Sequence, residues 1–244
     1  MDFRIDVFLS ALGSRALLEG IQVTIALTIV SMVFGLALGL AVALMRDATS
    51  PILRGIAWAY VWLFRAVPTL VLILMTWFAL PQLFPVLKAD WFNQFIAASL
   101  ALSVNEAAYA AEILRGGLLA VDEGQRLAAR ALGLTPGKVF TKVIAPQVVR
   151  VTIPPLSNDV ITMLKITSLA AFISLQEILA HTQSAISLDF RFAERYLAAA
   201  VYYLVIVSVL MVFQARIERR FRWISQRTPG RSAGQLVRQL APLR

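Results

Sequence analysis

Five polar or charged residues stand inside long apolar stretches of this chain, and their types could do chemistry. They are Arg65, Asn105, Glu106, Asp159 and Lys165. An ionisable side chain within a membrane-spanning segment costs roughly 2.5–3.5 kcal/mol on insertion scales, so such residues are candidates for function. The planar guanidinium of Arg65 matches a carboxylate group. The sequence therefore points to the binding of a polar solute, and it offers no catalytic residue.

The depth of these residues supports the grouping. At about 1.5 Å per helical residue, Arg65, Asn105 and Glu106 lie roughly 15 Å from the cytoplasmic ends of their segments, Asp159 about 10 Å and Lys165 about 20 Å. A membrane core is about 30 Å thick, so three segments bring polar groups near its middle. Solute sites are common there, beside broken helices. Pro68 lacks a backbone donor and could supply such a break.

Each of these side chains also has a structural interpretation. Arg65 could bind a solute carboxylate, pair with Glu106 or act as a gate. Asn105 could contact the amino group or backbone of the solute, or connect helices. Lys165 with Asp159 is better explained as a structural or gating pair. The full set of candidate pathway residues is Arg65, Thr69, Asn105, Glu106, Lys165, Thr167 and Ser168.

Composition places the chain in a membrane. Of its 244 residues, 59% are hydrophobic and 15% are charged, and the mean hydropathy is +0.75. Soluble domains have about 45–50% apolar and about 25% charged residues. The chain has no cysteine, which excludes a thiolate metal site, and we expect no metal site of any kind.

The apolar runs predict an all-α integral membrane protein with five spans, because each run approaches the roughly 20 residues that one crossing needs. Gly35 and Gly39 form a small-residue stripe in the first span, which would let another helix approach closely. We expect an outer segment at 1–19, a membrane domain at 20–215 and a basic tail at 216–244. The spans are predicted at 20–45, 55–80, 93–115, 152–175 and 196–215.

Charge predicts the orientation. The segments 46–54 and 115–150 and the tail from Arg216 carry a large excess of lysine and arginine, whereas acidic residues slightly outnumber basic ones in the intervening connections. Basic segments stay in the cytoplasm. The N-terminus is therefore expected outside and the C-terminus inside.

The connection at 116–150 is long for a loop and carries helix signals. Asp122 can cap a first helix, and Gly133 suits the position just after its end. Thr135 followed by Pro136 favours a second start. We expect a second helix of about two turns that ends before Pro146. The sequence thus predicts a helix–turn–helix hairpin on the cytoplasmic side.

Four spaced segments resemble the permeases of bacterial ABC importers, in the branch for polar amino acids. Residues 124–133 (GQRLAARALG) resemble the EAA loop, and residues 143–147 (VIAPQ) fall where that motif continues. Residues 64–69 (FRAVPT) resemble the R-G-T-P segment, residues 107–117 (AAYAAEILRGG) the A-Y-x-A-E-I-x-R-G-G stretch, and residues 165–169 (KITSL) the K-D-T-S-L segment.

The resemblance implies the type I importer permease fold in the bacterial inner membrane. It implies a second permease subunit, an ATPase dimer that receives the hairpin, and a periplasmic solute-binding protein. The ATPase would carry ATP and magnesium, and we expect no cofactor in this chain, whose Gly133 and Gly137-Lys138 lack the spacing of a phosphate loop. The expected docking residues are Gln125, Leu127, Ala128, Ala129, Leu132 and Gly133.

Three positions depart from the family pattern. Leu127 stands in place of the loop's glutamate, Ala145 in place of a leucine, and Ile166 in place of the acid of K-D-T-S-L. Ile166 leaves two alternatives open: a different solute, such as an opine or another non-amino-acid, or the non-binding half of a heterodimer. A passive channel would need a ring of charges or carbonyls, which no segment suggests. An intramembrane hydrolase would need a second aspartate or a serine–histidine pair within the membrane, and the sequence offers neither.

Overall fold

The computed structural model describes residues 3–221, and every regular element in that range is helical. The α-helices are α1 (Ile5–Leu12), α2 (Arg15–Arg46), α3 (Pro51–Ala66), α4 (Thr69–Leu74), α5 (Leu80–Leu83), α6 (Gln94–Leu119), α7 (Glu123–Ala131), α8 (Pro136–Val139), α9 (Ala145–Ile166), α10 (Ile178–Asp189) and α11 (Phe192–Phe221). Wider π turns occupy Met75–Ala79 and Phe140–Ile144, and 3-10 turns occupy Pro85–Lys88 and Thr167–Ile173.

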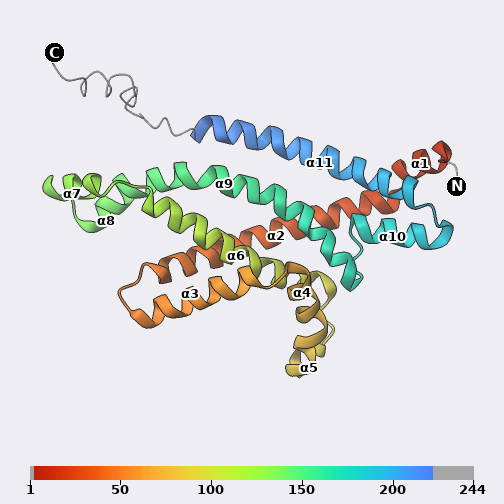
Figure 1. Ribbon diagram of the computed structural model, residues 1–244, viewed down its shortest axis with the longest axis horizontal. Helices are drawn as coiled ribbons and strands as arrows, with labels where there is room; N and C mark the ends of the chain where they lie inside the picture. Colours follow the sequence, from red (N-terminus) through yellow and green to blue (C-terminus); the bar gives the residue numbers. More distant parts are fainter. Residues whose placement is uncertain (1–2, 222–244) are drawn as a thin grey trace, which may run out of the picture.

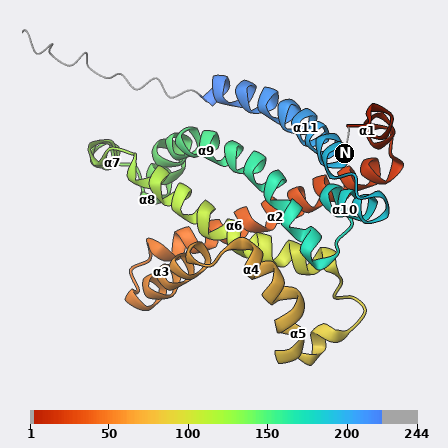
Figure 2. The same cartoon turned by 45° about the vertical axis from the view of Figure 1, so that its right-hand side comes forward.

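The long helices run lengthwise (Figure 1). The hairpin of α7 and α8, the α2–α3 connection and the C-terminal end of α11 lie toward one end of the molecule. Helices α1 and α10 lie at the other end, whereas α4 and α5 project sideways in both views (Figure 2). The segments expected in the cytoplasm therefore share one end. The tail beyond residue 221 lies outside the described residues.

Helices α2 and α6 form the centre of the bundle, and the glycine stripe explains how. A methyl group added at Gly35 would stand 2.7 Å from Cβ and Cγ of Glu106, and one at Gly39 would stand 2.8 Å from Cβ of Ala110. Real Cβ atoms do not approach so closely, so only glycine allows this packing. The close approach predicted for this stripe is confirmed.

Within residues 3–221, three helical segments are long and apolar enough to cross a membrane: Arg15–Arg46, Pro136–Ile173 and Phe192–Phe221. A fourth crossing is possible if Pro51–Ala66 and Thr69–Leu83 form one span, bent by 102°. Helix α6 has 26 residues but falls short in apolarity because of its polar side chains. The count of five spans therefore stays a prediction.

The bend falls at Pro68, as expected from the sequence. Helix α3 ends at Ala66 and α4 begins at Thr69. A proline at position 68 cannot donate to the carbonyl of Phe64 one turn earlier, so the helical ladder stops there. The segment predicted as a span at 55–80 is therefore interrupted between α3 and α4, and Arg65 lies at the end of α3.

The hairpin follows the prediction in its first half and differs in its second. The Asp122 carboxylate accepts a hydrogen bond from the Gly124 amide at 2.6 Å, and Gly133 adopts a left-handed φ of 76°. The expected stop before Pro146 is wrong: α8 passes through the π turn at Phe140–Ile144 directly into α9. A wide turn interrupts the regular bonding just ahead of Pro146, so a residue without an N–H can be placed there.

Candidate functional site

Asn105 holds the break between α3 and α4. Its amide nitrogen donates to the Phe64 carbonyl at 2.8 Å, the acceptor that Pro68 leaves without a helical partner. Its amide oxygen accepts from the Thr69 hydroxyl at 3.2 Å. Asn105 is buried, and both of its hydrogen bonds stay within the protein. This geometry favours the interpretation of Asn105 and Thr69 as connectors of helices.

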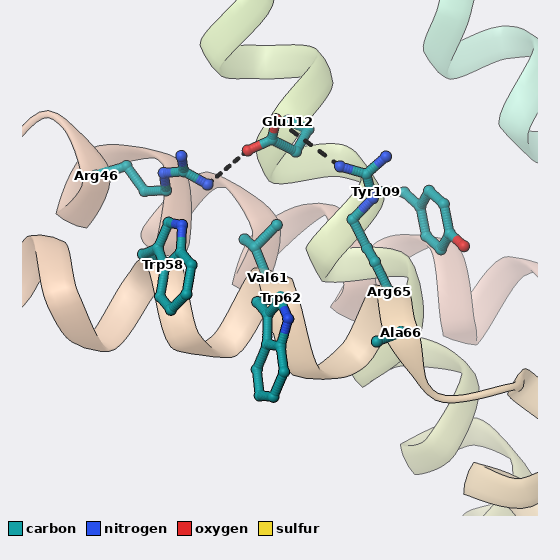
Figure 3. A pocket seen from close by; sticks show the side chains of 8 residues that line it. All are labelled: Arg46, Trp58, Val61, Trp62, Arg65, Ala66, Tyr109 and Glu112. Carbon is teal, nitrogen blue, oxygen red and sulfur yellow. Dashed lines mark hydrogen bonds and ion pairs between the residues drawn. The ribbon is translucent and has the colours of Figure 1, made fainter.

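Arg65 lines a cavity between α2, α3 and α6, and Asn105 is not part of its lining. Its guanidinium carbon lies 5.4 Å from the centre of the Tyr109 ring, and a terminal nitrogen lies 3.8 Å from Oε2 of Glu112. Its side chain is 46% exposed. The alternative pairing with Glu106 is not formed; the acid beside Arg65 is Glu112 (Figure 3).

Glu112 binds three arginines. Its Oε1 accepts from Arg46 at 2.6 Å. Arg115, at the expected i, i+3 position, donates to both of its oxygens at 3.2 and 3.4 Å. The Arg46 contact joins the end of α2 to α6 across 66 positions of sequence. Sequence reasoning missed it, because a pair so distant leaves no local pattern.

Glu106 and Asp159 each have one buried carboxylate oxygen without a hydrogen-bond partner among the described residues. Glu106 is 6% exposed and packs against Gly35, and its Oε1 has no hydrogen bond in the described part of the chain. The same holds for Oδ2 of Asp159. The expected ion pair of Lys165 with Asp159 is not formed among residues 3–221, because six positions along a helix place two side chains on different sides.

Lys165 instead lies beside α11. It lines a groove of about 500 Å³ with Ser168, Ala200, Tyr203, Leu204 and Val207. The hydroxyl of Ser168 donates to the Lys165 carbonyl at 2.8 Å. Thr167 is fully buried, and its hydroxyl donates to the Leu164 carbonyl at 2.7 Å. The structure therefore divides the candidate pathway residues into one group around α3 and α6 and another between α9 and α11.

The hairpin residues expected to dock a partner also divide. Leu127 is 58% exposed and Leu132 is 82% exposed, and Gln125, Ala128 and Gly133 are exposed beside them. Ala129 is buried at 5% exposure, in a small core with Val121, Val139 and Ile144. Leu127 and Leu132 thus form an outward apolar surface, whereas Ala129 supports the shape of the hairpin from within.

The aromatic walls of the Arg65 cavity were not predicted. Trp58 and Trp62 of α3 stack with ring centres 6.2 Å apart and planes 5° apart, and both line the cavity with Val61 and Tyr109. The i, i+4 spacing of the two tryptophans was a usable signal. The spacing alone could not indicate a cavity, because the charged residues beside the tryptophans come from α2 and α6.

Comparison with known proteins decides the family. The family described as "binding-protein-dependent transport system inner membrane component" matches residues 31–223. The chain belongs to this family. It is the permease component of an ABC importer and is embedded in a membrane by its apolar helices. Such a permease is not the catalytic chain, and ATP is hydrolysed by a separate ATPase; transport also involves a solute-binding protein.

Similar proteins support this assignment over nearly the whole permease. The arginine transport system permease protein ArgU of Corynebacterium glutamicum is 39% identical over 98% of this chain and 76% of its own length. The glutamine transport system permease protein GlnP of Escherichia coli is 35% identical over 84% of this chain and 93% of its own. A crystal structure of an amino acid ABC transporter with histidines aligns with a TM-score of 0.82 at 31% identity. The alignment covers 90% of this chain and 100% of the chain in that structure.

Proposed function

We propose that this permease moves a polar amino acid, or an amino-acid-like solute, from the periplasm to the cytoplasm by alternating access. The similarity to permeases named for arginine and for glutamine, over most of each chain, carries this proposal. The polar side chains inside the helical bundle agree with a hydrophilic cargo. Rocking of rigid helices around a site near the membrane middle would expose it to each side in turn.

Arg65 is the residue we assign to the solute carboxylate. Its guanidinium is half exposed, in a cavity of about 460 Å³. Within residues 3–221 the guanidinium makes no hydrogen bond, since its contact with Glu112 spans 3.8 Å. A planar guanidinium can hold a carboxylate through two parallel hydrogen bonds. Lys165 and Ser168 are assigned to the same pathway from the groove beside α11.

We assign the hairpin to the binding of the ATPase, and the charge of its end of the molecule supports an orientation. Leu127 and Leu132 offer an outward apolar surface at the end of the molecule where the basic connections also gather. By the charge rule this end is cytoplasmic, which places the N-terminus in the periplasm and the membrane as the bacterial inner membrane. Close packing of the hairpin core around Ala129 gives the stiffness that transmits a rigid-body motion.

The complete importer would contain two permease subunits, an ATPase dimer and a periplasmic binding protein. A second permease would cover the polar side chains that this subunit leaves exposed, such as Arg65 and Lys165. Ile166, which stands where the family has an acid, is partly buried against the main core and borders neither described cavity. The second candidate is that this chain is the non-binding half of a heterodimer, whose partner holds the acid that Ile166 replaces here.

Uptake by the reconstituted complex tests the proposal. The permease, its ATPase and its binding protein are placed in liposomes, and each of the common amino acids is supplied outside with ATP inside. We expect at least one polar amino acid to be accumulated and to stimulate ATP hydrolysis. Arg65→Ala should reduce that uptake at least tenfold, and Arg65→Lys should retain part of it, since a cation without the planar fork remains. Unchanged uptake by Arg65→Ala would remove Arg65 from the site.

A further inference from the structure

The cavity beside Arg65 has the size and lining of a ligand site. It encloses about 460 Å³, within the range of roughly 300–1,000 Å³ typical of small-molecule pockets. Three helices contribute to it: Arg46 ends α2, Tyr109 and Glu112 belong to α6, and the remaining lining residues come from α3 (Figure 3). These α3 residues are Trp58, Val61, Trp62, Arg65 and Ala66.

The charges around this cavity do not cancel. One carboxylate, that of Glu112, faces the guanidinium groups of Arg46, Arg65 and Arg115. Among the described residues no other acid forms an ion pair with any of the three. The cluster therefore keeps an excess of positive charge, and its side chains are shielded from water to different degrees. A partly buried excess of this sign favours an anion.

Arg65 is the member of the cluster that an incoming anion can reach at least cost. Arg46 and Arg115 hold Glu112 by hydrogen bonds of 2.6 to 3.4 Å, whereas the Arg65 contact at 3.8 Å is too long for one. A carboxylate that binds Arg65 breaks no hydrogen bond of the cluster. Glu112 keeps two arginines when Arg65 turns away, so it is not left as an unpaired charge.

The opposite wall suits the apolar part of the same ligand. The parallel rings of Trp58 and Trp62 are more than half exposed, and they flank the cavity (Figure 3). Stacked indoles offer a flat apolar surface and can also receive a cationic group over their faces. The site thus combines an anion end with an aromatic side.

The depth of Arg65 indicates a solute pathway as the surroundings, and not lipid. Arg65 lies about 21 Å along α3 from Pro51, at about 1.5 Å per residue. A guanidinium that is 46% exposed at that depth would be costly to leave in hydrocarbon. Its open side must face water or a second subunit. Both surroundings belong to the passage between two permeases.

We propose that this cavity, which holds Arg65, is an exit station of the solute pathway, on the cytoplasmic side of the Asn105 break. Arg65, with Arg46, holds the carboxylate of a departing solute there, and Trp58 and Trp62 pack against its side chain. The proposal rests on the proposed amino acid transport. It deepens the assignment of Arg65 by giving its site an exit position and by adding Arg46, Trp58 and Trp62 as residues that contact the solute.

A thiol placed in the cavity measures its charge and its occupancy. The chain has no cysteine, so Ala66→Cys introduces a single small reporter at an exposed lining position. The full complex in lipid nanodiscs is treated with a negatively charged ethylsulfonate and a positively charged trimethylammonium methanethiosulfonate. Val209→Cys, on the exposed apolar surface of α11, is the control and should react little with either reagent.

We expect the negative reagent to modify Ala66→Cys roughly tenfold faster than the positive one, after correction by a free thiol, because of the positive excess. Arg65→Gln should lower this ratio and Glu112→Gln should raise it, and opposite responses cannot both come from misfolding. A ratio near one, or the same response to both changes, would overturn the charged station.

Protection by solute tests the occupancy. The amino acid that the uptake screen identifies should slow modification of Ala66→Cys at least threefold, and its carboxamide derivative should not. Protection by phosphatidylglycerol in the nanodisc without protection by solute would assign the cavity to lipid and overturn the proposal. A screen that finds no amino acid would refute the transport assignment, while the reagent ratio would still report on the charged cavity.

Discussion

The hydrogen bond from Asn105 to the Phe64 carbonyl makes a quantitative prediction. The bond is 2.8 Å long, and the acceptor has no helical partner because residue 68 is proline. In Asn105→Ala this carbonyl becomes unpaired, at a cost of about 1–3 kcal/mol in general. Hydrogen bonds between membrane helices average about 0.6 and reach about 1.7 kcal/mol. We therefore expect the free energy of unfolding to fall by about 1–2 kcal/mol through this bond.

A double-mutant cycle with Pro68→Ala isolates that contribution. Alanine at 68 restores an N–H that can donate to Phe64, so Asn105→Ala should cost about 1 kcal/mol less in the Pro68→Ala background. The cavity left by the shorter side chain is present in both backgrounds and cancels. Unfolding is followed by circular dichroism in mixed micelles as the fraction of denaturing detergent rises.

Two outcomes would refute the reasoning. Equal costs of Asn105→Ala in both backgrounds would mean that the amide does not replace the missing proline donor. The control Thr69→Val removes only the 3.2 Å bond to the amide oxygen and should cost less than Asn105→Ala. An equal or larger cost for Thr69→Val would place the stabilising bond elsewhere.

Three further predictions concern the packing of α2, the cap of α7 and the exposed surface of the hairpin. Gly35→Ala should destabilise the bundle by about 1–3 kcal/mol through overpacking, since its Cβ would stand 2.7 Å from Glu106. A methyl group at Gly116 meets no atom within 4 Å, so the control Gly116→Ala should not destabilise. Equal melting temperatures of the two variants would contradict the close approach of α2 and α6. Asp122→Ala should cost about 1 kcal/mol of cap energy, seen as faster amide exchange at the start of α7, and Asp122→Asn should retain most of it. Leu132→Glu, at an exposed position of the hairpin, should leave stability unchanged but lower solute-stimulated ATP hydrolysis. The control Leu188→Glu is equally exposed on α10, at the opposite end of the molecule, and it should lower neither stability nor ATP hydrolysis.

Local rules predicted much of the backbone. The cap at Asp122, the left-handed Gly133 and the break at Pro68 each depend on a few neighbouring residues, so the sequence was sufficient. The passage of the helix through Pro146 was not predictable in this way. It depends on a wide turn at Phe140–Ile144, whose formation is decided by packing within the hairpin.

The candidate site was predicted only in part, because side-chain direction and distant partners are tertiary properties. Arg65 was identified by its depth, but its neighbours Arg46 and Glu112 come from other helices. Ala129 was assigned to the outer surface of the hairpin, yet the turn at Gly133 folds α8 against it and buries it. Lys165 and Asp159 share a helix, but its rotation separates them.

Cross-linking of the hairpin to the ATPase tests the central claim most directly. Because the chain has no cysteine, Leu132→Cys in the hairpin and Leu188→Cys in α10 each provide one thiol, and these two elements lie at opposite ends of the molecule. Each variant is assembled with the ATPase and treated with a short cross-linker that carries a maleimide for the thiol and an amine-reactive ester for lysines of the ATPase. The account predicts that the thiol at position 132 joins the permease to the ATPase and that the thiol at 188 does not. Cross-linking at 188 without cross-linking at 132 would contradict it.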